Sequence, residues 1–147
     1  MKMAMPYLMF DGNTEEAFDF YKSVFGGEIM GVVRYGDFGD SMPVAESDRN
    51  KVANIALPLG DDNDKILMAS DTIGPTPLTV GNNVYVIIEP DSTEEAERFF
   101  DSLAAGGQVE MSLQSTQWAE KHGMCTDRFG IHWMVNYTGS VQYSPGR

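Results

Sequence analysis

The chain has 147 residues, which is enough for one domain or two very small ones. Hydrophobic residues make up 42% and charged residues 22%, close to the average of globular proteins, so disordered and fibrous classes are excluded. The net charge of −12 repels phosphate backbones and anionic membranes. We therefore expect neither nucleic acid nor a membrane as a partner.

Three further absences in the sequence narrow the class of protein. The longest apolar runs, such as 84–88, are far shorter than the roughly 20 residues that span a bilayer. Asp11 comes too early for the apolar region of a signal peptide. The single cysteine, Cys125, permits no internal disulfide and no zinc site with two or four cysteines. These features predict a cytoplasmic protein.

An internal repeat is the strongest pattern in the chain. The segment TEEAFDFYKSVFGGEI at 14–29 aligns with TEEAERFFDSLAAGGQV at 93–109, with eight of sixteen positions identical after one gap at Ala105. The preceding segments 7–11 and 85–89 also match in kind. The repeat therefore spans a strand, a helix start, a helix and a turn in both halves.

Each copy predicts a helix with its own start and stop. Asn13 with Glu16, and Ser92 with Glu95, have the spacing of a capping box. Apolar and aromatic side chains then recur on one helical stripe, which is typical of packing surface. The glycine pairs 26–27 and 106–107 end the two helices.

Strand-like segments follow each helix, so each half is predicted to be a β-α-β-β-β module. The predicted strands are 28–35, 51–59 and 65–70 in the first half, and 108–113, 118–126 and 131–137 in the second. Hairpin turns are expected at 60–64 and 127–130, and the acidic segment 36–50 is expected to be a mobile loop.

These modules predict a single α+β domain of residues 1–147. It consists of a first module over 4–71, a linker over 72–82 and a second module over 83–138. The modules are expected to form one half-open, barrel-like mixed sheet with the helices on its outer face. The alternation of side chains along strands then places Asn54 and Met134 on the opposite, concave side, where ligands commonly bind.

The tandem modules resemble the vicinal oxygen chelate superfamily, which includes glyoxalase I, bleomycin and fosfomycin resistance proteins and extradiol dioxygenases. The opening PYLMFDGNTEEAFDFYKSVFGGEI and the segment DRFGIHWMVN at 127–136 are similar to its PhnB-like branch. Members of this branch are often labelled after 3-demethylubiquinone methyltransferase. Because the chain has no glycine-rich motif for binding adenosylmethionine, the label is not evidence of that activity.

The resemblance implies a divalent metal held by His and Glu side chains in the cavity. Those ligand positions correspond here to Pro6/Tyr7, Leu67/Met68, Val84/Tyr85 and Met134, and none supplies an imidazole or a carboxylate. Many PhnB-like sequences carry His at the position of Asn54. We therefore expect no metal or other cofactor, with a divalent metal as the alternative.

Several residues are candidates for a site. His122, with Glu120 two residues away, could act as a general base, or it could be a cavity-wall histidine without a catalytic role. Cys125 is expected on the other face of the strand, as a small core group under the second helix. The expected ligand-binding residues are Asn54, Met68, Trp118, His122, Met124 and Met134.

Two functions remain open at this point. The first is a protein that binds a small organic ligand in the concave cavity without a catalytic metal, as bleomycin-resistance proteins do. The second is a metal-dependent lyase, isomerase or dioxygenase of the glyoxalase kind, so whether the chain is an enzyme is undecided. The resembled superfamily also implies a homodimer, which would cover exposed strand edges.

Overall fold

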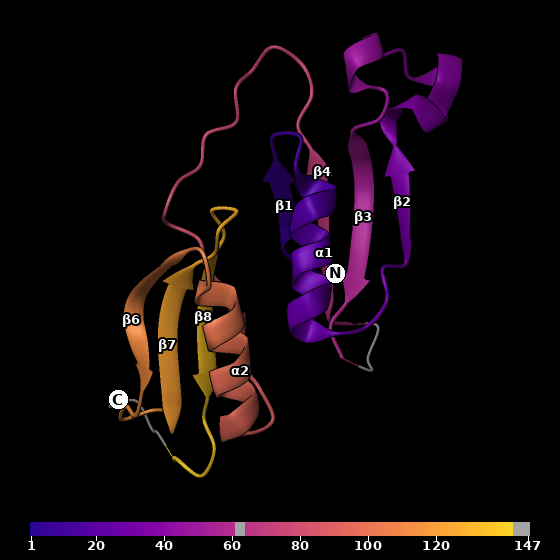
Figure 1. The fold of residues 1–147 in the computed structure, drawn as a ribbon. Coiled ribbons are helices and arrows are strands. Elements are labelled where there is room, and N and C mark those ends of the chain that lie inside the picture. The colour runs from indigo at the N-terminus through magenta and orange to yellow at the C-terminus, as the bar shows by residue number, and fades with distance from the viewer. Residues whose placement is uncertain (61–63, 143–147) are drawn as a thin grey trace. The chain divides into compact units, whose positions relative to one another are not determined.

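A computed structural model describes residues 1–60 and 64–142 and contains the β-α-β-β-β order twice (Figure 1). Two short 3₁₀ helices, η1 and η2, lie within the first half. The chain divides into two compact units, residues 1–79 and 80–147. The α+β class and the two modules predicted from the repeat are confirmed. The main elements are β1 (Tyr7–Phe10), α1 (Thr14–Phe25), β2 (Gly31–Arg34), β3 (Val52–Pro58), β4 (Ile66–Asp71), β5 (Val86–Ile88), α2 (Thr93–Ala104), β6 (Gln108–Gln114), β7 (Lys121–Thr126) and β8 (His132–Tyr137).

The first unit is a mixed sheet with α1 packed on one face (Figure 1). Its strand order is β1-β4-β3-β2, with β1 parallel to β4 and the other neighbours antiparallel. The helix buries Phe18 and Tyr21, while β3 contributes Ile55 and Leu57 to the same core. Alternation therefore leaves Asn54 and Ala56 on the opposite side of β3, the helix-free face.

The start of α1 differs from its prediction. Asn13 makes no side-chain cap, so the capping box expected from Asn13 and Glu16 is wrong. Asp71 accepts a hydrogen bond from the backbone N–H of Thr14 instead, at 3.1 Å. A carboxylate from the end of β4 thus satisfies a donor of the first helical turn.

The segment 36–50 also differs from the simple loop that was expected. It includes most of the 3₁₀ helix η1 (Tyr35–Ser41) and all of η2 (Glu46–Asp48). Asp37 accepts a hydrogen bond from the backbone N–H of Arg34 at 2.7 Å, and the Arg34 guanidinium pairs with Glu15 at 2.6 Å. The first contact connects the segment to β2, and the ion pair connects β2 to α1.

The second unit repeats the architecture with strand order β5-β8-β7-β6. Here β5 is parallel to β8 and the other neighbours are antiparallel. Ser92 accepts a hydrogen bond from the backbone N–H of Glu95 at 3.1 Å, which confirms this half of the predicted capping box. The Glu95 carboxylate accepts from the backbone N–H of Asp91 at 2.7 Å instead of from that of Ser92. Cys125 and Trp133 are fully buried in this core, which confirms the expected place of the cysteine.

The turn at 127–130 is organised by one buried carboxylate. Asp127 accepts hydrogen bonds from the backbone N–H groups of Phe129 and Ile131 and from the indole N–H of Trp133, at 2.8, 3.1 and 2.9 Å. Gly130 completes the turn with a φ of 88°. The other predicted turn, 60–64, includes residues 61–63, which lie outside the described residues.

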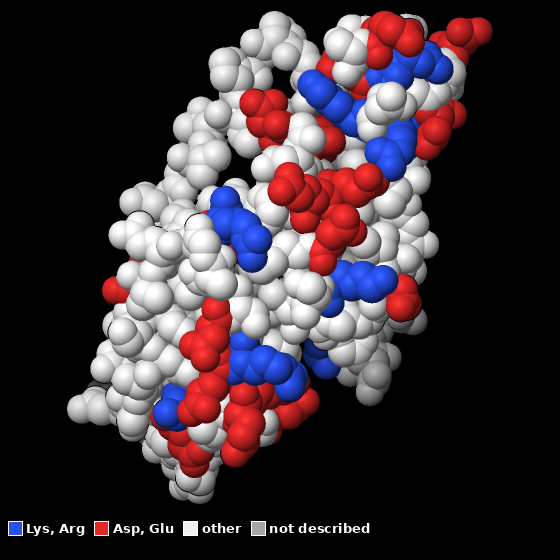
Figure 2. Space-filling view, in the orientation of Figure 1, with Lys and Arg blue, Asp and Glu red and all other residues white. Residues whose placement is uncertain are grey.

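The two faces of the second sheet can be assigned from Gly123. A Cβ added there would lie 2.7 Å from Phe100 of α2, so this position faces the helix. Its neighbours His122 and Met124 therefore point to the helix-free face. Figure 2 shows acidic and basic side chains gathered over the helices, as expected for helix surfaces in contact with water. Within the described part of the chain, no helix is long and apolar enough to cross a membrane.

Candidate functional site

The helix-free face of the first unit brings together two predicted ligand-binding residues. Met68 on β4 is the register partner of Tyr7 on β1. Asn54 donates a hydrogen bond from Nδ2 to the Tyr7 hydroxyl at 3.2 Å. Tyr7 and Met9 are 43% and 40% exposed on this face. The face therefore combines accessible apolar surface with a fixed amide.

The helix-free face of the second unit holds the other four predicted residues. His122 pairs in register with Asn136, and Met124 pairs with Met134. Trp118 precedes β7 instead of starting it, because this strand begins at Lys121. Its ring still lies edge to face with the His122 ring, with 5.3 Å between the ring centroids.

A chain of hydrogen bonds fixes the His122 ring. Nδ1 of His122 lies 2.8 Å from Oδ1 of Asn136, and Nδ2 of Asn136 donates to Glu89 at 2.8 Å. The other carboxylate oxygen of Glu89 accepts from the backbone N–H of Thr138 at 2.7 Å. A carboxylate therefore orients the imidazole through an amide.

Glu120 does not belong to this chain of contacts. Its carboxylate accepts hydrogen bonds from the hydroxyl and the backbone N–H of Ser140, at 2.6 and 3.0 Å. These bonds hold the pKa of Glu120 below its usual range. Within the described residues, the carboxylate connected to His122 is Glu89, not the predicted Glu120.

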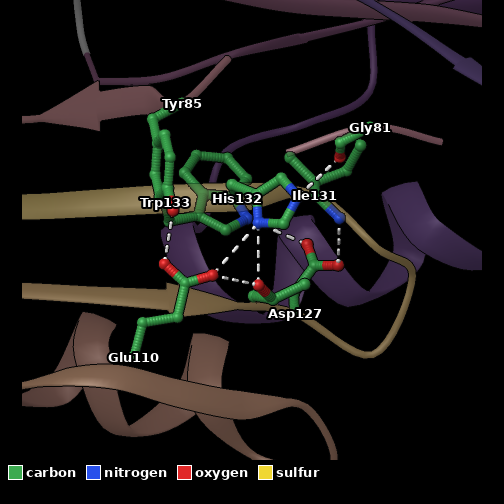
Figure 3. A network of polar contacts seen from close by, with 8 residues as sticks. Gly81, Tyr85, Glu110, Asp127, Ile131, His132 and Trp133 are labelled. Atoms are coloured by element: carbon green, nitrogen blue, oxygen red, sulfur yellow. Dashed lines mark hydrogen bonds and ion pairs between the residues drawn. The ribbon is translucent and has the colours of Figure 1, made fainter. Parts of the chain in front are cut away.

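A second polar cluster on the same face was missed at the sequence level (Figure 3). Glu110 accepts hydrogen bonds from Thr126 at 2.6 Å and from the Tyr85 hydroxyl at 2.5 Å. Nδ1 of His132 lies 3.3 Å from Glu110 and 2.7 Å from Thr126, while Nε2 contacts the carbonyl oxygen of Gly81 at 2.8 Å. Alternation along β8 places His132 on the same face as Met134. The register of β6 is irregular next to Glu110, so the face of Glu110 could not be predicted.

Hydrogen bonding changes two pKa values in this cluster. The bonds from Thr126 and Tyr85 favour the ionised carboxylate and lower the pKa of Glu110. The same bond with Glu110 favours the neutral phenol and raises the pKa of Tyr85. The cluster therefore presents a carboxylate whose two oxygens are already bound by neighbouring side chains.

The positions that could hold the superfamily's metal are uncharged. Tyr7 and Ile87 are the first-strand residues paired with Met68 and Met134, so the place expected near Val84/Tyr85 falls on Ile87. Neither pair fits an ion that prefers carboxylate and imidazole ligands, because one offers a phenol and a thioether and the other an alkyl group and a thioether. Among residues 1–60 and 64–142, no three His, Cys, Asp or Glu side chains form a group that could hold a metal ion.

The repeated β-α-β-β-β fold is that of the vicinal oxygen chelate class. A fosfomycin resistance protein, FosX from Listeria monocytogenes, shares the fold with a TM-score of 0.63, covering 95% of this chain and 97% of that one at 8% identity. The family model for 3-demethylubiquinone-9 3-methyltransferase matches residues 2–136. The chain therefore belongs to this family, the PhnB-like branch of the superfamily.

Individual relatives agree with that assignment. Protein YjdN of Escherichia coli is 32% identical over 138 residues, covering 89% of this chain and 92% of YjdN. Protein PA1353 from Pseudomonas aeruginosa is 39% identical with a TM-score of 0.81, covering 93% of this chain and 98% of the other. A Bacillus cereus PhnB protein, described as a putative 3-demethylubiquinone-9 3-methyltransferase, is 27% identical with a TM-score of 0.73, covering 93% and 99%.

Proposed function

We propose that the protein binds a small organic ligand on the helix-free faces of its sheets, without a catalytic metal. The observation that carries the proposal is the exposure of large apolar side chains on these faces. Tyr7 and Met9 are exposed in the first unit, and Ile87 and Trp118 are 61% and 41% exposed in the second. Covering such surface with a ligand is favourable by about 25 cal/mol for each Å² of apolar area.

The side chains around this apolar surface suit a ligand with few polar groups. Met68, Met124 and Met134 are flexible thioethers that adapt to varied shapes. Asn54 and His122 are polar groups held in place by hydrogen bonds. Apolar walls with a small number of positioned polar groups are typical of small-molecule sites.

The alternative function is a metal-dependent lyase, isomerase or dioxygenase of the glyoxalase kind. The uncharged pairs favour the metal-free proposal over this alternative; they are Tyr7 with Met68 in the first unit and Ile87 with Met134 in the second. Metal analysis of protein purified without chelator separates the two. We expect less than a tenth of an equivalent of Ni, Mn, Zn or Fe, and a stoichiometric metal would overturn the metal-free part of the proposal.

Ligand binding is tested by thermal shift with a panel of aromatic and amphiphilic compounds. A compound at 100 times its Kd stabilises the folded state by about 2.7 kcal/mol, which is a readily measured shift. Trp118→Ala should weaken binding of the hits, whereas Val84→Ala should not, because Val84 is 72% exposed but lies in none of the strands. A panel in which nothing stabilises the protein would contradict a binding function.

We also propose that the protein is a homodimer. The strands β1, β2, β5 and β6 each lie at an edge of their sheet, and such edges are commonly covered by another chain. Light scattering after size exclusion should give about twice the chain mass of 16.2 kDa. A monomeric mass at all concentrations would contradict this proposal.

A further inference from the structure

Asn136 has only one orientation that satisfies its neighbours. Its Nδ2 group donates to Glu89 at 2.8 Å and also contacts the Thr138 hydroxyl at 3.3 Å. Ionised carboxylates only accept hydrogen bonds, so the amide nitrogen must face Glu89. The amide oxygen is therefore the atom that faces Nδ1 of His122 at 2.8 Å.

This orientation decides the tautomer of His122. A carbonyl oxygen cannot donate a hydrogen bond, so Nδ1 of His122 must carry the proton and donate it to Asn136. In a neutral imidazole the other nitrogen, Nε2, then has a free lone pair. Glu89 and Asn136 thus act as positioning residues: they hold Nδ1 of His122 and leave Nε2 as the hydrogen-bond acceptor on the other side of the ring.

Nε2 of His122 is available to a ligand. Within the described residues, Nε2 has no hydrogen-bond partner. Every fully buried side-chain nitrogen or oxygen there does have a partner, so Nε2 is not fully buried and retains contact with solvent. The residue as a whole is only 6% exposed, so this acceptor is largely covered by its neighbours and is poorly solvated. Such an acceptor discriminates strongly between ligands with and without a hydrogen-bond donor. A ligand that covers Nε2 without donating a hydrogen bond leaves this nitrogen unpaired.

The side chains around Nε2 indicate which kind of ligand would donate a hydrogen bond to it. The Trp118 ring stands at 73° to the imidazole and is 41% exposed, so it offers an apolar surface beside the acceptor. Met124 and Met134 form the adjacent cross-strand pair on the same face. Aromatic and thioether groups pack well against a flat ring.

We propose that Nε2 of His122 accepts a hydrogen bond from a hydroxyl group on a planar organic ligand whose ring packs against Trp118. The inference rests on the proposed ligand-binding function and narrows it to hydroxylated planar compounds. A ligand of the same shape with an ether in place of the hydroxyl cannot donate this bond. The hydroxyl compound should therefore bind more tightly than the matched ether.

The matched pair is 2-naphthol and 2-methoxynaphthalene, measured by quenching of tryptophan fluorescence and by calorimetry. We expect 2-naphthol to bind about tenfold or more tightly, as for one hydrogen bond to a poorly solvated acceptor. His122→Phe should bind the two compounds within about twofold of each other, while Val84→Ala should keep the wild-type ratio. The quantity compared is the Kd of 2-methoxynaphthalene divided by the Kd of 2-naphthol. A ratio near one in the wild-type protein, or a wild-type ratio that is unchanged in His122→Phe, would overturn the proposal.

Nitrogen-15 NMR of the imidazole tests the arrangement without any ligand. The expected signals at neutral to alkaline pH are those of the Nδ1–H tautomer for His122, and Asn136→Leu should abolish that preference. An Nε2–H tautomer in the wild-type protein would overturn the inference even if naphthalenes bind. If neither naphthalene binds, the ligand class is wrong, and the compound panel then shows separately whether ligand binding itself fails.

Discussion

Asp71, the last residue of β4, binds Thr14, the first residue of α1, through two hydrogen bonds to one oxygen. Oδ1 accepts from the Thr14 hydroxyl at 2.6 Å and from its backbone N–H at 3.1 Å. The other oxygen accepts from the backbone N–H of Val52 at 2.8 Å. One buried carboxylate, 2% exposed, therefore joins α1, β3 and β4 in the first unit.

Replacing Asp71 with Ala should destabilise the protein strongly. The substitution leaves two buried N–H groups and a hydroxyl without their acceptor, and each unsatisfied group costs about 1–3 kcal/mol. We expect a loss of about 3–5 kcal/mol in the free energy of unfolding, measured by urea denaturation. The matched variant Ser92→Ala removes the partly exposed cap of α2 and should cost only about 1 kcal/mol. Equal losses of unfolding free energy in the two variants would contradict the proposal that Asp71 stabilises the first unit through three buried hydrogen bonds.

The lowered pKa of Glu110 predicts how its contribution to stability depends on pH. Because the folded-state pKa is depressed, the stabilisation is present above the ordinary value of 4.5 and disappears as the pH falls through the folded-state pKa. Glu110→Gln should therefore be less stable than wild type at pH 7, and the difference should shrink below pH 4.5. Denaturant unfolding between pH 3.5 and 7 measures this difference.

The control for this pH dependence is Glu94→Gln. Glu94 lies in the first turn of α2, away from the polar cluster, and its replacement removes one carboxylate without removing the bonds from Thr126 and Tyr85. Thr126→Val should reproduce part of the Glu110→Gln effect, since the hydrogen bond from Thr126 is the main cause of the lowered pKa of Glu110. A difference that stays constant across the pH range would show that the carboxylate contributes through packing alone.

The fold could be predicted because the repeat and the strand alternation are local patterns. The same helix pattern appears twice, and its apolar stripe required a sheet face to cover it. The start of α1 could not be predicted in the same way. Asn13 and Glu16 have the spacing of a capping box, but Asp71, which is 57 residues from Thr14, supplies the acceptor instead. Only the folded chain brings that carboxylate to the helix.

The candidate site was predictable where strands are regular and not elsewhere. Period two along β7 and β8 places His122 and Met134 on one face, as the register confirms. Glu120 precedes β7, so the alternation of side chains along a strand, which would place it on the same face as His122, does not apply to it. Glu110 was missed because the register of β6 shifts between Val109 and Met111. The role of Asn136 depends on Glu89, a contact that spans 47 residues.

Cys125 should be almost unreactive in the folded protein. Burial beneath α2 raises the pKa of its thiol to about 12, so the nucleophilic thiolate is nearly absent at neutral pH. We expect no measurable reaction with Ellman's reagent over an hour at pH 7.5, and one thiol per chain after unfolding in guanidinium. Rapid labelling of the native protein at pH 7.5 would show that the second unit opens readily or that the thiol is accessible.

Gly107, which follows α2, should be the least replaceable of the second unit's glycines up to residue 142. A Cβ at this position would lie 2.0 Å from the carbonyl oxygen of Thr126 and 2.9 Å from the carbonyl carbon of Asp127, and backbone atoms cannot move aside cheaply. Gly107→Ala should cost about 3 kcal/mol or more, at or above the upper end for overpacking. Gly31→Ala is the matched control, because Gly31 has an ordinary φ and nothing within 4 Å of its added Cβ. The free energy of unfolding of both variants is measured by urea denaturation. Similar values for the two variants would contradict the prediction, because they would mean that the turn after α2 relaxes to admit a side chain.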